Sequence, residues 1–293
     1  GSPSSHRVRS TLTPSGRRRI RQSALAGGGP WIMAGRGLHT VVSTLEHEHP
    51  ALGETITCHL GVKTGLNRVF LDPPPEIEPE VLRWAVCGRD VKAFRCKCTR
   101  RLLWTHDAHG CPSARLPPAA EAYLKRHDSA LRARRDYQGG LSWVVFRARA
   151  AVSRFRVVWP DLARRLTAAP LTSGPDLQCI PINSCYVAPM SQAVHAEALA
   201  AWLNSTWIGA IARLGAVPAS GGFARFNARV ISRLPLPSSA VLDSNLSQLA
   251  RRARSGERVQ RDLDDIVAKH LGLSISAQRA LLSVLAETSD RRR

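Results

Sequence analysis

Residues 61–70 restrict the local fold of this chain more tightly than any other segment. They follow residues 55–60, where apolar and polar side chains alternate in a pattern that predicts a strand. The residues that impose the constraint are Gly61, Lys63, Thr64, Gly65 and Asn67. Two glycines that lie four positions apart allow a tight turn. The amides, the hydroxyl and the ammonium of such a turn can all face one anionic or polar partner.

The spacing differs from that of a nucleotide-binding P-loop. A P-loop has four residues between its glycines and a Lys-Ser or Lys-Thr pair after the second glycine. Here the Lys63-Thr64 pair lies between the two glycines, so the loop is not a Walker motif. A simpler interpretation stays open, in which Gly61 and Gly65 serve only the geometry of the turn.

Further motifs follow the loop in order along the chain. They are Cys87-Gly88-Arg89-Asp90-Val91-Lys92, Arg101-Leu102-Leu103-Trp104-Thr105-His106-Asp107, Leu116-Pro117-Pro118-Ala119 with Tyr123-Leu124, Trp159, residues 183–187, residues 199–205 and Leu234-Pro235-Leu236-Pro237. In this order they resemble the target-recognition domain of the TaqI-like family of adenine-specific DNA methyltransferases and single-chain restriction-modification enzymes. The resemblance covers residues 30–285.

The resemblance implies a domain that holds double-stranded DNA and presents an adenine to a methyltransferase domain or chain. The residues that it implies for phosphate contacts are Lys63, Arg89, Lys92, Arg95 and Arg225. Asn67 or Asn227 would read base edges, and Thr64 and Gly222 complete the expected DNA-binding set. A competing interpretation makes Arg89 the partner of Asp90 in an internal ion pair.

Residues 221–227 form a second candidate DNA-binding segment. Their sequence, Gly-Gly-Phe-Ala-Arg-Phe-Asn, combines flexible, aromatic and cationic residues, which suits a loop that lies along a DNA groove. The alternative is a structural turn with Phe223 or Phe226 packed into the core.

The catalytic motif of an adenine-N6 methyltransferase is not found. That motif is Asn, Asp or Ser followed by Pro-Pro and an aromatic residue, which stacks on the flipped adenine. Asp72-Pro73-Pro74-Pro75 ends in a proline without a π face, and we interpret it as a polyproline turn. Gly27-Gly28-Gly29 lacks the preceding apolar strand of a cofactor-binding turn and indicates a linker. We therefore expect no catalytic residues and no cofactor in this chain, with adenosylmethionine bound by a catalytic domain upstream or on another chain.

The charge of the chain independently favours a polyanionic partner. The 293 residues contain 42 Lys and Arg against 22 Asp and Glu, a formal net charge of +20. Residues 30–237 carry 26 basic and 15 acidic residues, so the surplus extends beyond the basic first 29 residues. Contacts between basic side chains and phosphates release counterions, which stabilises DNA complexes.

Composition and periodicity predict an α+β fold, a mixed recognition domain with a small helical tail. We expect a disordered basic arm or linker at 1–29, the DNA target-recognition domain at 30–237 and the tail at 238–293. Predicted helices cover 38–45, 118–137 and 193–215, with three more in the tail, one of them closed by Gly272. Predicted strands cover 55–60, 67–71, 101–105, 142–147, 155–159 and 179–188.

Cysteine content and hydropathy suggest a reduced, cytoplasmic protein. Seven cysteines in a chain of this length do not indicate a disulfide framework. A zinc site could be drawn through Cys87, Cys96, Cys98, His106, His109 and Cys111, but the Cys-Lys-Cys spacing is too short for a zinc knuckle. We expect no membrane partner, because polar residues interrupt the most apolar window, 199–217.

Two other functions remain open at this point. The chain could be a separate specificity subunit that joins methyltransferase and nuclease chains. It could instead be a complete adenosylmethionine-dependent methyltransferase whose motifs depart from the family pattern. Neither the recognised DNA sequence nor the presence of a nuclease follows from these residues.

Overall fold

A computed structural model describes residues 36–174, 179–241 and 243–290. The expected arm at 1–29 and the expected start of the folded region at 30–32 lie outside these residues. The expected mixed α+β class is confirmed, since helices and short strands alternate along the described chain.

The helices are α1 (Arg36–Glu48), α2 (Leu52–Thr55), α3 (Asn67–Phe70), α4 (Pro118–Arg126), α5 (Asp128–Arg132), α6 (Ala148–Ala151), α7 (Ala193–Asn204), α8 (Thr206–Gly215), α9 (Ala228–Ile231), α10 (Ser238–Val241), α11 (Ser244–Ser255), α12 (Gln260–His270) and α13 (Ile275–Asp290). Short 3-10 turns are η2 (Pro79–Val81), η3 (Gly88–Asp90) and η4 (Ser220–Gly222). The strands are β1 (His59–Leu60), β2 (Leu82–Val86), β3 (Val91–Lys92), β4 (Arg95–Cys96), β5 (Arg100–Leu103), β6 (Phe155–Pro160), β7 (Leu162–Ala163), β8 (Ala169–Thr172), β9 (Cys179–Pro181), β10 (Cys185–Met190), β11 (Val217–Pro218) and β12 (Ala224–Arg225).

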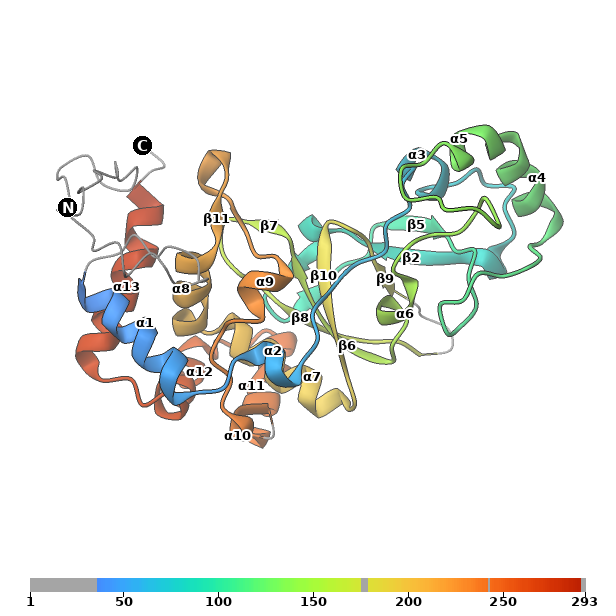
Figure 1. Cartoon of the computed structure of the whole chain (residues 1–293). Helices are drawn as coiled ribbons and strands as arrows, with labels where there is room; N and C mark the ends of the chain where they lie inside the picture. The colour runs from blue at the N-terminus through green and yellow to red at the C-terminus, as the bar shows by residue number, and fades with distance from the viewer. Residues whose placement is uncertain (1–35, 175–178, 242, 291–293) are drawn as a thin grey trace, which may run out of the picture.

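The elements form an elongated molecule with two lobes (Figure 1). The large lobe contains α1, α2, α7 to α13 and the small sheet β11-β12-β7, and it packs on the four-stranded sheet β1-β10-β6-β8. The small lobe contains α3 to α6 and the sheet β5-β2-β9. In that sheet β2 pairs antiparallel with β5 and parallel with β9.

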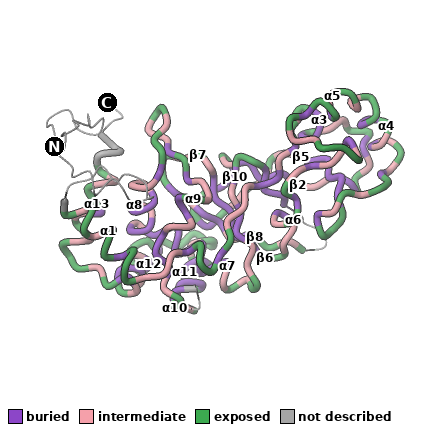
Figure 2. The backbone as a smooth tube through the Cα atoms, in the orientation of Figure 1, coloured by how far each residue is buried: buried purple, intermediate pink, exposed green. Residues whose placement is uncertain are grey.

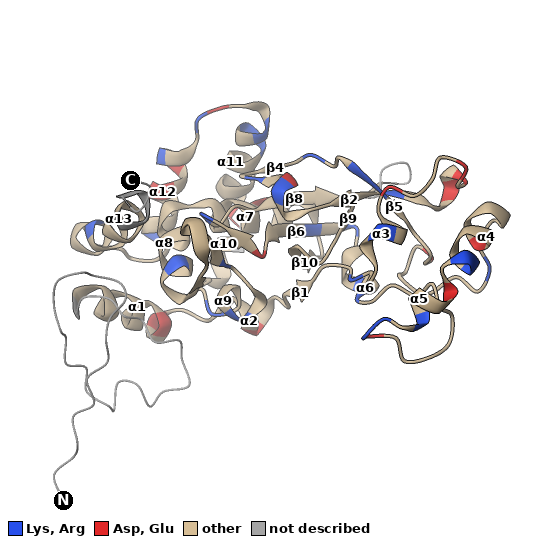
Figure 3. Cartoon of the chain, turned by 90° about the horizontal axis from the view of Figure 1, so that it is seen from above, with Lys and Arg blue, Asp and Glu red and all other residues tan. Residues whose placement is uncertain are grey.

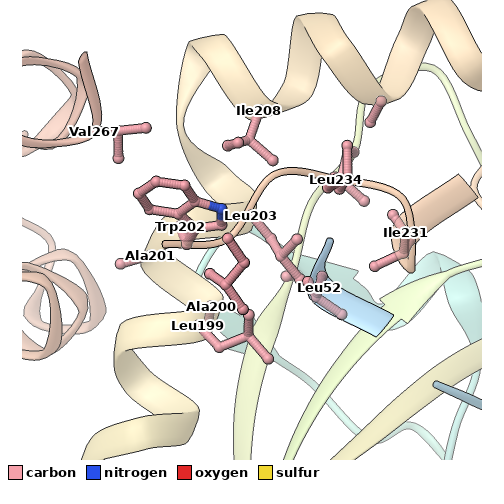
Figure 4. Close-up of a cluster of buried hydrophobic side chains, with 14 of the residues drawn as sticks. Leu52, Leu199, Ala200, Ala201, Trp202, Leu203, Ile208, Ile231, Leu234 and Val267 are labelled. Atoms are coloured by element: carbon pink, nitrogen blue, oxygen red, sulfur yellow. The ribbon is translucent and has the colours of Figure 1, made fainter. Parts of the chain in front are cut away.

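Helix α7 lies at the centre of the large lobe, and Figure 2 shows buried residues along it and along the central strands. Every residue from Ala196 to Asn204 is buried, which explains why this segment is apolar except for Glu197 and Asn204. The Trp202 indole packs among aliphatic side chains and donates to the carbonyl of Pro235 at 3.0 Å (Figure 4). Leu246, Leu263 and other side chains of the last helices belong to the same core, so these helices pack on the large lobe.

A separate hydrophobic core holds the small lobe together. Phe70, Leu102, Leu124 and Ile180 are fully buried in it. It therefore draws side chains from helix α3, strands β5 and β9 and helix α4, which are far apart in the sequence.

Several predicted elements are confirmed. Helix α1 buries Val42 and Leu45 as its periodicity requires, and strands β5 and β6 and the pair β9 and β10 coincide with the predicted strands. The three helices predicted after residue 237 are present as α11, α12 and α13, and Gly272 ends the second of them at φ +60°.

The predicted strand at 67–71 is wrong, because these residues form helix α3. Val69 and Phe70 are both buried, which adjacent residues of a strand with one solvent face cannot achieve. The predicted strand at 55–60 is reduced to β1, since helix α2 takes Thr55 and docks through the Leu52 amide on the carbonyl of Leu234 at 2.8 Å.

Residues 142–147 form no strand, because side chains use the carbonyls that a ladder would need. Arg134 donates to the carbonyl of Ser142 at 2.5 Å, and the Thr105 hydroxyl donates to that of Trp143 at 2.7 Å. Only Phe146 pairs in a bridge, with Lys63.

The two long predicted helices are each divided. The first breaks between α4 and α5 at His127. The second breaks at Ser205, whose hydroxyl accepts from the Ile208 amide at 3.3 Å and starts α8. Next to this break the Asn204 amide side chain bonds both backbone groups of Ala168, at 2.9 and 2.8 Å. Asn204 and Ser205 are therefore structural.

Candidate nucleic-acid interface

The loop at 61–67 crosses from the central sheet into the small lobe. The backbones of Lys63 and Phe146 exchange two hydrogen bonds, at 3.0 and 2.9 Å. A Cβ on Gly61 would lie 2.3 Å from the carbonyl oxygen of Ile182, so the close approach of two backbones requires glycine there. Gly65 has φ +68°, the left-handed region that favours glycine. The fold therefore requires glycine at both positions, whether or not the loop binds a ligand.

Thr64 belongs to the interior of this loop. It is 1% exposed, and its hydroxyl donates to Asn67 Oδ1 at 2.6 Å while accepting from the Leu66 amide at 3.2 Å. The Thr64 hydroxyl therefore orders the loop and does not face a partner. Asn67 is exposed at the start of α3, with its carbonyl oxygen already bonded.

The buried side chain of Arg134 fixes the loop at 61–67 through hydrogen bonds to backbone carbonyls. Its guanidinium is 6% exposed and donates to the carbonyls of Leu131, Thr64 and Ser142, at 2.8, 2.5 and 2.5 Å. It also lies over the Phe146 ring, 5.0 Å from its centroid. Burial lowers the pKa of Arg134. The side chain of Arg134 is therefore a buried clamp of the loop.

A band of basic side chains runs along the surface from this loop to the large lobe. We define the basic band as Lys63, Arg135, Arg147 and Arg225. Arg135, Arg147 and Arg225 are exposed, and the side chain of Lys63 is 35% exposed. The basic band therefore offers positive charge from both lobes.

Backbone pairing brings these residues near one another, since Phe146, the neighbour of Arg147, forms a bridge with Lys63. Lys63 Nζ lies 2.5 Å from Asp136 and holds the pKa of that carboxyl below its usual range. Arg135 and Arg147 lower the pKa of Asp136 further, so both guanidinium groups lie near the Lys63 pair.

The same Arg147 also reaches Tyr186 in the central sheet. Burial raises the pKa of the Tyr186 phenol, and the charge of Asp161 raises it further. The charges of Arg147 and Arg225 oppose this rise. Arg147 lines a groove with Leu60, which pairs with Tyr186, and Tyr186 stacks on Trp159, whose indole donates to Phe226 beside Arg225. Arg147 thus lies between the Lys63 end of the basic band and the Arg225 end.

Arg147 has an unusual backbone. Its φ of +64° places a non-glycine residue in the left-handed region, immediately before α6. Such conformations are uncommon and are concentrated at functional sites. Arg147 also lines a groove of about 490 Å³ together with His59, Phe146 and Arg149. Sequence periodicity alone could not have singled out Arg147.

The segment at 221–227 contains the end of the turn after β11 and the central strand, β12, of the sheet β11-β12-β7. Gly221 and Gly222 have φ +66° and +75° at its turn, and nothing lies within 4 Å of a Cβ added to Gly222. Phe226 is fully buried, as the structural alternative expected, and its carbonyl accepts from the Trp159 indole at 2.8 Å. Phe223 is half-buried beneath the Arg164 guanidinium, which lies 5.2 Å from its ring centroid.

The two polar candidates of this segment already have partners. Arg225 forms an ion pair with Asp161, and its side chain is still 53% exposed. Asn227 caps helix α9 by accepting from the Val230 amide at 3.1 Å, so its role in the fold is explained without DNA.

The remaining candidates, Arg89, Lys92 and Arg95, form a second basic surface, which we call the hairpin cations. Lys92 and Arg95 pair across the β3-β4 hairpin, and Arg95 donates to the carbonyl of Arg254 at 3.2 Å. Arg89 lies 3.9 Å from Asp90, the weak ion pair that the sequence allowed. Seen from above in Figure 3, β4 lies beside α11, whereas β1, β10 and α9 lie on the opposite side. The structure does not bring the hairpin cations together with the basic band.

The cysteine and histidine residues do not converge. Within residues 36–174, 179–241 and 243–290, no group of three or more His, Cys, Asp or Glu residues is arranged to hold a metal. Cys98 Sγ lies 2.9 Å from Cys179 Sγ, and His106 is buried beside Trp104, which lowers its pKa to about 4. Among the helices in the described part of the chain, none has the length and apolar character that a membrane crossing needs.

Asp72 also has a structural role. One of its carboxylate oxygens accepts from the Arg101 amide at 2.9 Å, and the other from Arg100 Nε at 2.7 Å. The carboxylate therefore anchors the start of β5 instead of facing an open site.

Comparison with known proteins reveals similarity at the level of fold. No family model matches the chain, and neither does any curated protein sequence. The solved structure of the type IIG restriction endonuclease BpuSI is similar, with a TM-score of 0.54, 13% identity and coverage of 87% of this chain. The type IIL restriction-modification enzyme MmeI, solved in complex with DNA, aligns over 83% of this chain with a TM-score of 0.44 and 14% identity. This chain covers 32% of BpuSI and 33% of MmeI, and it shares its fold with about a third of BpuSI.

Proposed function

We propose that this chain is the DNA target-recognition domain of an adenine-N6 DNA methyltransferase or restriction-modification enzyme. The fold shared with part of BpuSI supports a place in a restriction-modification system. The order of sequence motifs supports the adenine-specific, TaqI-like assignment. Adenosylmethionine and the catalytic residues would belong to a methyltransferase domain or chain outside residues 1–293.

The basic band is the observation that carries this proposal. Its cations come from the loop at 61–67, from the segment before α6 and from β12, so one duplex could contact both lobes. Lys63, Arg135 and Arg147 would bind phosphates, which fixes the position of the duplex without reading its sequence. Asp136 and Asp161 each pair with one of these cations, so the free protein keeps part of the positive charge balanced.

Selection from a random pool of duplexes tests the proposal. The full chain, immobilised at low salt, should retain duplex DNA and enrich one short sequence over successive rounds. Retention without any enrichment would reduce the function to general DNA binding. The absence of retention at low salt would contradict the proposal, because the phosphate contacts supply most of the non-specific affinity.

A specificity subunit is the second candidate, and helix α13 favours it. Ile275 and Leu282 are 69% and 47% exposed and lie seven residues apart, so they share one face of the helix. An exposed apolar face of this kind can bind a neighbouring chain. Co-purification of a methyltransferase chain, lost in an Ile275→Ser and Leu282→Ser double variant, would support this candidate.

A further inference from the structure

One surface of the small sheet β11-β12-β7 combines features that its role in the fold does not require. Val217 pairs with Arg225, and Arg225 pairs with Leu162, in one row across the three antiparallel strands. Directly paired residues of antiparallel strands project from the same face of a sheet. Val217, Arg225 and Leu162 therefore form one line of side chains, the Val-Arg-Leu row.

This row faces solvent. Val217 is 58% exposed, Leu162 is 43% exposed, and the Arg225 side chain is 53% exposed. The adjacent row contains Ala224, which is fully buried in the core of the large lobe. Pro218, which pairs with Ala224, is exposed, so the sheet packs on the protein through β12, and β11 is exposed on both faces. The Val-Arg-Leu row lies on the face opposite to Ala224.

Exposed aliphatic residues of this size are few in the described chain. The large hydrophobic residues that are exposed there are Leu162, Val194, Val217, Ile275 and Leu282. Two of these five flank one arginine on neighbouring strands, and Phe223 with Arg164 above it lies at the turn of the same sheet. Burial in the fold does not explain this arrangement, whereas contact with a partner does.

Charge identifies the kind of partner. Arg225 lies at the large-lobe end of the basic band: it pairs with Asp161, and its neighbour Phe226 accepts from the Trp159 indole, which stacks on Tyr186. A duplex on the basic band would therefore pass this sheet. DNA grooves admit β-strands, and proteins that bind grooves commonly combine arginine with apolar side chains that contact the bases.

We propose that the Val-Arg-Leu row enters a groove of duplex DNA and makes its apolar contacts with the bases. On binding, Arg225 leaves its ion pair with Asp161 and contacts the DNA. Val217 and Leu162 pack against base edges and are no longer exposed to water. This inference rests on the proposed function and adds the element that contacts the bases and the chemistry by which it does so.

A charge-neutral double substitution tests the proposal. Val217→Thr and Leu162→Thr remove apolar surface but keep residues that favour strands, so the sheet should still form. Binding of the full chain to a fluorescent duplex should weaken roughly five- to tenfold. The dependence of log K on log salt should keep its slope, because neither substitution removes a phosphate contact.

Val194→Thr is the matched control, because Val194 is 38% exposed on α7, away from β11 in Figure 1. It should bind DNA as the wild type does. If the double variant binds DNA with the affinity of the wild type and keeps its thermal stability, the inference is overturned, while general DNA binding remains. The same result is expected if another protein binds the Val-Arg-Leu row. Absence of DNA binding by the wild type would instead reject the proposed function itself, and this inference with it.

Discussion

Replacement of Arg134 by methionine should destabilise the protein far more than replacement of its neighbour Arg135. Methionine keeps most of the length and apolar character of the side chain but removes every donor. The carbonyls of Thr64 and Ser142 would each lose the donor that they have in the structure. The carbonyl of Leu131 would still accept from the backbone amide of residue 134 at 3.4 Å.

The magnitude follows from these two carbonyls. A buried acceptor without a donor costs about 1–3 kcal/mol, so the variant should lose about 2–6 kcal/mol of unfolding free energy. Since a protein of this size shifts by roughly 2–4 °C per kcal/mol, Tm should fall by at least about 4 °C. Arg135 is exposed, and Arg135→Met should change stability by less than about 0.5 kcal/mol.

Thermal and urea unfolding of both variants would measure this difference. Arg134→Met should show a lower Tm and a lower urea midpoint, whereas Arg135→Met should keep the wild-type Tm and bind DNA less tightly. If both variants unfold at the wild-type temperature, Arg134 is not the clamp of the loop at 61–67 and the reasoning is refuted.

Three further results are expected. Asp136→Asn should raise affinity for duplex DNA about fivefold at low salt, because it frees Lys63 from a neighbouring negative charge; lower affinity in a fluorescence titration would contradict this. Asn67→Ala should cost about 1–3 kcal/mol in urea unfolding, because the buried Thr64 hydroxyl loses its acceptor; wild-type stability would refute the structural role of Asn67. His106 has a pKa of about 4 in the folded protein against 6.5 for an exposed histidine. The contribution of His106 to the unfolding free energy should therefore be full above pH 6.5 and fall as the pH drops toward 4. Urea unfolding at pH 7 and at pH 5 would measure this fall, which should be smaller in His106→Gln than in the wild type.

Periodicity was sufficient for the long elements. Residues at helical spacing in α1, α11 and α12 face the core as predicted, because each helix buries one stripe against the large lobe. On α13 the prediction holds for Leu281, which is buried, and fails for Leu282, which is exposed. Strand β6 was equally readable, since a run of β-branched and aromatic residues here lies in the middle of a sheet.

Short elements were misread where side chains replace the usual backbone partners. Nothing in the sequence reveals that the Arg134 guanidinium donates to the carbonyl of Ser142. This side-chain hydrogen bond replaces a strand partner, so residues 142–147 do not join a sheet. Helix α3 occupies a stretch with strand-like composition because both Val69 and Phe70 are needed in one core. Tertiary packing decides such short segments, and local propensity does not.

The candidate site was only partly accessible from the sequence. Lys63 and Arg225 do lie at the two ends of the basic band, but Arg147, which connects them, has no sequence motif. Its left-handed backbone and its position between the lobes are visible only in three dimensions. The separation of the hairpin cations from the basic band could not be predicted either, because it depends on which side of the sheet each loop leaves.

The central claim is that duplex DNA lies on the basic band. The most direct test compares how salt weakens DNA binding by three proteins: the wild type, a band variant and a hairpin variant. The band variant carries Lys63→Gln, Arg135→Gln and Arg147→Gln, and the hairpin variant carries Arg89→Gln, Lys92→Gln and Arg95→Gln. Each variant loses three positive charges, so any difference between them reports position and not net charge.

Each lost phosphate contact should lower the slope of log K against log salt by about 0.9. The account predicts that the slope of the band variant falls by roughly 2–3, while the hairpin variant stays near the wild type. The account would be contradicted if the slope of log K against log salt fell in the hairpin variant and stayed at the wild-type value in the band variant. The DNA would then lie on the opposite side of the molecule.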